Sequence, residues 1–166
     1  MGKILIWAAL LLLAWPATAG ANIGDSIIQL RKRYGSAKDM GGQLLFEVRL
    51  VNGQLLPARG TEKDETPHFS IAVYFDGDKS AMEVFTRNTS DPAKADLSPD
   101  DVKAILASSV SGGPWVPYAE QNGKQVWMWG DEQGKPAKLM AKLTTNRTGK
   151  ADDASVLVIM INDKVR

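Results

Sequence analysis

The 166-residue chain contains no cysteine and a single histidine, His68. The absence of cysteine excludes disulfides, thiolate metal sites, thiol nucleophiles and a lipid anchor on cysteine. One histidine excludes metal cages and catalytic pairs built from histidine. As a general base, His68 would need a nucleophile and an orienting acid, and no GxSxG or SxxK motif supplies them. We therefore expect His68 to be a solvated or edge-strand residue.

The chain also lacks an excess of either charge. Twenty Lys and Arg residues balance 19 Asp and Glu residues, for a net charge of +1. This balance gives no electrostatic basis for a nucleic acid or an anionic membrane as partner. Gly112-Gly113 follows a predicted helix, whereas a phosphate-binding glycine loop precedes one.

No acidic motif points to catalysis or metal binding. Asp76, Asp78 and Glu83 lack the full spacing of a calcium loop, and Asp-Gly-Asp is common in turns. The sequence therefore predicts no cofactor, no metal site, no catalytic residue and no enzyme. Paired carboxylates for glycoside hydrolysis have no sequence signature. A secreted carboxylate-dependent hydrolase or carbohydrate-active domain thus remains the alternative function.

The chain has one long apolar run, and it lies at the N-terminus. Lys3 precedes 12 apolar residues at 4–15, and Pro16 and the small residues 17–19 follow them. This pattern predicts a signal peptide over residues 1–19, cleaved after Ala19. A run of 12 is shorter than the roughly 20 residues of a membrane-spanning helix, although a retained anchor is the alternative. We expect an exported protein, periplasmic or secreted, that is soluble and has no membrane span after cleavage.

Two short helices are predicted from their start signals. Ser26 and Gln29 form a capping-box pattern, and Gly35 is placed to end the first helix. The second helix begins at Ser98, a good N-cap, with Pro99 at the first helical position. Each helix carries one apolar stripe: residues Ile27, Leu30 and Tyr34 in the first, and Val102, Ile105 and Leu106 in the second.

Alternating apolar and polar residues predict strands along the rest of the chain. Asn52-Gly53 is a strong hairpin signal, and Asp76-Gly77-Asp78 marks a second turn. The predicted strands cover residues 44–51, 69–75, 80–87, 125–129, 139–145 and 155–162, with a weak strand at 54–58.

This order of elements predicts an α+β fold: antiparallel sheets with short helices on one face. We expect one compact domain over residues 20–166. The predicted caps at Ser26 and Ser98 favour a tandem repeat of a helix followed by three strands, over 24–87 and 97–162. One continuous sheet of about six strands, shared by both halves, is the alternative.

The aromatic cluster of the second half is the main candidate site. Trp127 and Trp129 share one face of a strand whose other face is also apolar, and Trp115 and Tyr118 come shortly before. Such a strand is either buried on both sides or presents aromatic anchors to a partner. The candidate partner-binding residues are Trp127, Trp129, Trp115 and Tyr118.

Two segments carry a family resemblance: GDSIIQLRKRYG at 24–35 and GDKSAME at 77–83. They resemble the start of small uncharacterised exported bacterial proteins. The helix-first, three-strand module is similar to the β-lactamase inhibitor protein and to BamE-type outer-membrane assembly lipoproteins. These families imply a non-enzymatic role in binding other proteins. The inhibitor has disulfides and BamE has a lipidated cysteine, neither of which is possible here, so no functional residue is carried over.

These observations predict an exported, non-enzymatic protein-binding or structural module of the cell envelope or secretome. Its partner would be another exported protein or a second copy of the chain.

Overall fold

The computed structural model describes residues 23–58, 66–109, 114–121, 124–129, 139–145 and 154–161. The predicted signal peptide and Gly112-Gly113 lie outside the described residues. In chain order the elements are α1 (Ile27–Tyr34), β1 (Ala37–Asp39), β2 (Gln43–Val51), β3 (Gln54–Pro57), β4 (His68–Asp76), β5 (Lys79–Arg87), the 3₁₀ helix η1 (Pro92–Lys94), α2 (Pro99–Ser109), β6 (Trp115–Gln121), β7 (Lys124–Trp129), β8 (Leu139–Thr144) and β9 (Val156–Ile161).

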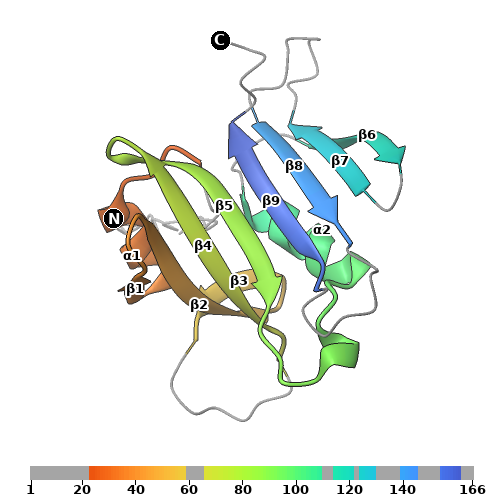
Figure 1. Cartoon of the computed structure of the whole chain (residues 1–166), viewed down its shortest axis with the longest axis horizontal. Coiled ribbons are helices and arrows are strands. Elements are labelled where there is room, and N and C mark those ends of the chain that lie inside the picture. Colours follow the sequence, from red (N-terminus) through yellow and green to blue (C-terminus); the bar gives the residue numbers. More distant parts are fainter. Residues whose placement is uncertain are drawn as a thin grey trace, which may run out of the picture.

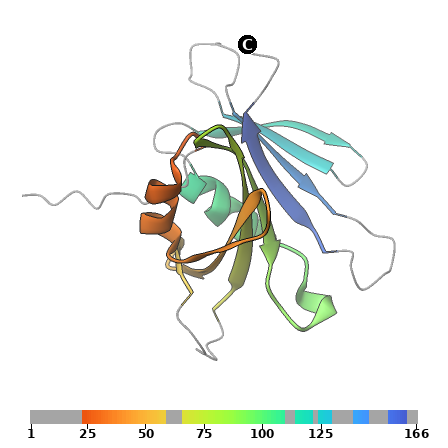
Figure 2. The same ribbon diagram turned by 60° about the vertical axis from the view of Figure 1, so that its left-hand side comes forward.

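All nine of these strands belong to one antiparallel sheet. Its order is β1-β2-β4-β5-β9-β8-β7-β6, and β3 pairs with β2 off this path. The pairing of β5 with β9 joins the two halves of the chain. Figure 1 looks onto one face of the sheet, with α2 behind it, and Figure 2 shows how strongly the sheet curves. We call the face toward the helices the inner face and the opposite one the outer face.

The α+β prediction is therefore wrong, because the fold is dominated by its sheet. Helices of 8 and 11 residues accompany nine strands in the part of the chain described. The predicted tandem repeat of a helix and three strands is wrong as well, since five strands follow α1 and four follow α2. The strands that the sequence did not predict, β1 and β6, explain much of this error. One has three residues, and the other contains Pro117 and no clean alternation.

The local signals within the elements are confirmed. Ser26 and Gln29 form the capping box of α1, and Gly35 after it has φ +83°. Asn52 and Gly53 both have positive φ, as a tight hairpin requires. At α2, the backbone N–H of Asp101 donates to Ser98 Oγ (3.1 Å), and that of Ser98 donates to Asp101 Oδ2 (2.9 Å).

The hydrophobic core lies on the inner face and crosses from one half of the sheet to the other. Leu30 and Tyr34 bring α1 onto it, with the Tyr34 ring edge-on to Phe46 at 5.5 Å between centroids. An ion pair between Arg87 of β5 and Asp101 (3.2 Å) ties the start of α2 to the sheet. The fully buried apolar side chains include Phe46, Val48, Phe69, Ile71, Val73, Phe85, Ile105, Ala141, Leu157 and Ile159. Among the described residues, no helix has the length and apolar character needed to cross a membrane.

Candidate ligand-binding cleft

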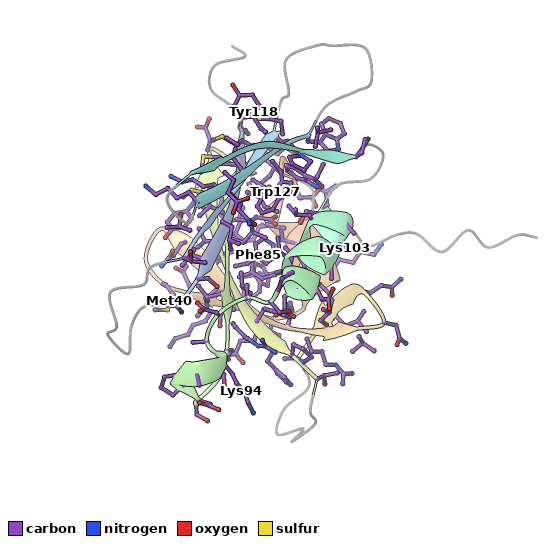
Figure 3. The ribbon with its side chains drawn as sticks, turned by 90° about the vertical axis from the view of Figure 1, so that its right-hand side faces the viewer. Met40, Phe85, Lys94, Lys103, Tyr118 and Trp127 are labelled. Atoms are coloured by element: carbon purple, nitrogen blue, oxygen red, sulfur yellow. The ribbon has the colours of Figure 1, made fainter. Side chains whose placement is uncertain are left out.

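The strand register places three tryptophans side by side on the inner face. Trp115 of β6 lies opposite Trp129 of β7, and Pro117 lies opposite Trp127. Residues directly opposite on antiparallel strands point to the same side of a sheet. Figure 3 shows Trp127 between the strands and α2. The strand with two apolar faces that the sequence predicted thus turns its tryptophan face toward α2.

An open cleft of about 760 Å³ separates α2 from this part of the sheet. Its apolar walls include Val102 and Leu106 of α2, Trp115 and Trp127, and Leu143 of β8. Its polar lining consists of Lys103, Gln125 and Thr145. Lys103 carries the only charge among the described residues that line the cleft, and Figure 3 shows it on α2.

Trp115 also fixes the position of one cleft wall. Its indole Nε1–H donates to the backbone carbonyl of Leu106 at 2.9 Å. Leu106 is among the last four residues of α2. The backbone carbonyls of the last four residues of a helix accept no hydrogen bond from within the helix. The indole therefore satisfies a terminal carbonyl and ties β6 to the end of α2, so that Trp115 has both a structural and a lining role.

The other two predicted residues lie outside this cleft. Trp129 is half-buried, and its indole Nε1 is buried without a hydrogen-bond partner in the described part of the chain. Tyr118 is 72% exposed. It lies at the bulge of β6, between Pro117 and Ala119, and lines a second hollow of about 410 Å³ that Gln125 and Trp127 also line. The structure thus brings Trp115 and Trp127 together with α2 at the cleft, whereas Tyr118 shares only the second hollow with Trp127.

Sequence reasoning missed the helical wall of the site. Lys103, Leu106 and Ala107 follow one side of α2 and line the cleft. The sequence predicts Leu106 in the apolar stripe of this helix, and it gives no signal for the flanking Lys103 and Ala107. Lys103 and Ala107 line the cleft only because α2 lies at a distance from the second half of the sheet. No local sequence pattern predicts that distance.

A third hollow, of about 330 Å³, brings two carboxylates together. Asp39 at the end of β1 and Asp78 in the β4–β5 turn both line it, beside Gln43 and Phe75. Both aspartates are exposed, whereas a general acid of a glycosidase needs burial that raises its pKa. Within the described ranges, no group of three or more histidine or carboxylate side chains could hold a metal ion.

A buried polar cluster lies between α1 and β5. Glu83 is 1% exposed, and neither carboxylate oxygen has a hydrogen-bond partner among the residues described. Burial raises the pKa of Glu83 to about 8, while nearby Arg33 lowers it and Asp25 raises it. Arg33 pairs with Asp25, whose backbone N–H donates to Ser80 Oγ at 3.1 Å. None of the three hollows is lined by Glu83, so no substrate reaches it through them.

Tyr34 completes this cluster. Its hydroxyl is buried without a hydrogen-bond partner in the part of the chain that the structure describes. Burial, and then the negative charge of Glu83, raises the pKa of the Tyr34 hydroxyl well above its ordinary value near 10. The phenol therefore stays neutral at any physiological pH.

No protein-family model, curated protein or solved structure matches this chain. The resemblance to the β-lactamase inhibitor protein and to BamE-type lipoproteins therefore stays a prediction. The functional argument rests on the geometry of the cleft.

Proposed function

We propose that this is an exported, non-enzymatic binding protein whose cleft between α2 and β6–β8 takes an apolar ligand that bears an acidic group. The observation that carries this proposal is an open, tryptophan-walled cleft with one cation and no carboxylate among its described lining residues. The ligand is a free apolar acid or the apolar C-terminus of a partner protein, which share this chemistry.

The size and lining of the cleft support an apolar ligand. Its volume of about 760 Å³ lies within the range of roughly 300–1,000 Å³ typical of ligand pockets. Trp115 and Trp127 offer large, rigid apolar surfaces that lose little conformational freedom when a ligand binds. Leu106, in the wall formed by α2, is 6% exposed and so adds contact area from the edge of the core.

The charge of the lining supports an acidic group on the ligand. The Lys103 ammonium can pair with a carboxylate at the rim, and a basic ligand would meet no counter-charge in the lining. Because Lys103 is exposed, its pairing contributes modestly, about 1 kcal/mol.

The edge of β6 that faces away from β7, which pairs with no other described strand, is a weaker docking site than the cleft. Pro117 lacks a backbone N–H, and a bulge follows it. Both features blunt an edge strand against pairing with another chain. The hydrolase alternative would depend on Asp39 and Asp78, which lie in a different hollow from the tryptophans.

The proposal is tested by titrating the purified protein with anilinonaphthalene sulfonate, a fluorescent apolar anion, and displacing it with decanoate, decanol or decylamine. We expect decanoate to displace the probe best and decylamine worst. Lys103→Gln should weaken decanoate about fivefold and leave decanol unchanged, as about 1 kcal/mol predicts. Ala107→Trp should fill the cleft and abolish binding of all three.

Tyr118→Ala is the matched control, because it removes an exposed aromatic side chain outside the cleft. Its affinities should equal those of the wild type. Unchanged binding to folded Ala107→Trp would refute the proposal. Titration with peptides that end in two apolar residues distinguishes a free apolar acid from a protein C-terminus as the ligand. Each peptide is measured with a free C-terminal carboxylate and with a C-terminal amide. Tighter binding of the free-acid peptide than of decanoate would identify a protein C-terminus.

A further inference from the structure

Four of the six methionines form one continuous row across the outer face of the sheet. Met82 of β5 lies opposite Met160 of β9, Met160 lies opposite Met140 of β8, and Met140 lies opposite Met128 of β7. Each neighbour is therefore a direct cross-strand partner, and the side chains of such partners are in contact range.

This row lies on the side of the sheet away from the helices. In Figure 2 both helices lie on the concave side, opposite the outer face. All four methionine side chains are partly exposed to solvent. Tyr74 and Val116, which continue the row at its two ends, are 37% and 51% exposed. Each of the four methionines thus presents part of its surface to solution.

The next row of residues on the outer face shows that a need for apolar surface does not by itself explain why methionine occupies these four positions. It consists of Ala72, Val84, Val158, Lys142 and Val126, again in direct register. β-Branched valine suits the pleated surface of a strand, and methionine has no such advantage. What methionine adds is a flexible side chain ending in a soft, polarisable sulfur.

We propose that this row binds one soft monovalent metal ion, Cu(I), through the thioethers of Met160 and Met140, with Met82 or Met128 as third ligand. Thioether sulfur selects Cu(I) over harder cations. Neighbouring strands lie about 4.8 Å apart, so adjacent methionine sulfurs can converge on one ion. With no cysteine in the chain, methionine is its sole source of sulfur ligands. The site is independent of the cleft.

The test is a titration with silver nitrate in chloride-free buffer, using Ag(I) as a redox-stable substitute for Cu(I). Methionine methyl NMR signals and native mass spectrometry report binding. We expect one bound Ag(I) per chain and shifts of the methyl signals of Met160, Met140 and one flanking methionine. The double variant Met160→Leu/Met140→Leu should weaken binding at least about tenfold, because it removes the two central soft ligands.

Met40→Leu is the control. Met40 is 46% exposed and lies beside Gln43, three strand spacings or roughly 14 Å from Met82. Methionine and leucine have similar volumes, so these variants should fold, and the single variant Met160→Leu serves if the double variant does not. Absence of Ag(I) binding, equal binding by wild type and folded variant, or an equal loss in Met40→Leu would overturn the proposal.

Discussion

Replacing Glu83 with glutamine should raise the free energy of unfolding at pH 9 by several kcal/mol and flatten its dependence on pH between about 4.5 and 8. The carboxyl group lies on the inner face between Val73 and Ile159, with no hydrogen bond to either oxygen among the described residues. Burial raises the pKa of Glu83 to about 8, against the ordinary 4.5. Each pKa unit corresponds to about 1.4 kcal/mol.

The sign of the effect follows from proton binding. Between pH 4.5 and 8 the folded protein holds the Glu83 proton and the unfolded chain releases it, so stability falls as the pH rises. Below pH 4.5 both states are protonated and Glu83 imposes no penalty. Above pH 8 both are ionised and the full penalty applies. The positive charge of Arg33 in α1 reduces this penalty, whereas the negative charge of Asp25 increases it.

The measurement is urea denaturation at pH 5, 7 and 9 for the wild type and for Glu83→Gln. Glutamine keeps the shape of glutamate without its charge, so the two proteins should be nearly equal at pH 5 and diverge toward pH 9. Glu47→Gln is the control, since Glu47 is exposed on the outer face of β2. Equal stabilities of Glu83→Gln and wild type at pH 9 would show that the carboxylate is solvated or paired.

Glu83 also shows which feature of this fold the sequence does not predict, namely which face of β5 is buried. Alternation along residues 80–87 separates Met82 and Val84 from Glu83, and the structure confirms that separation. Alternation alone does not tell which set faces inward. That depends on Val73 in β4 and Ile159 in β9, and the pairing of β5 with β9 joins segments more than 70 residues apart. Such pairings leave no local pattern.

The same distinction applies to the candidate site. Trp127 and Trp115 were recognisable as anchors because large aromatic side chains near a strand with two apolar faces are unusual. The cleft itself was not predictable, because it arises from the separation between α2 and the strands after it. Lys103 and Ala107 acquire their place in the lining only from that separation.

Replacing Phe85 with alanine should lower the stability of both halves of the sheet together. Phe85 is fully buried on β5, and its direct partners are Ile71 of β4 and Leu157 of β9. It therefore lies where the first half of the chain meets the second. Removing a buried phenylalanine side chain typically costs about 3–5 kcal/mol. For a chain of this size the melting temperature should fall by roughly 10 °C.

Two optical probes show whether the halves unfold together. The tryptophans of residues 20–166 are Trp115, Trp127 and Trp129 of β6 and β7. In a protein of these residues, tryptophan fluorescence therefore reports on the second half, whereas far-ultraviolet circular dichroism reports on all strands. In Phe85→Ala both melting curves should shift by the same amount. Tyr118→Ala should shift neither, because this side chain is 72% exposed. If fluorescence stayed at the wild-type midpoint while circular dichroism shifted, the halves would be independent units. Equal shifts of both melting curves would instead mean that the buried pairing of β5 with β9 makes the sheet one cooperative structure. The cleft would then depend on the first half of the chain for its stability.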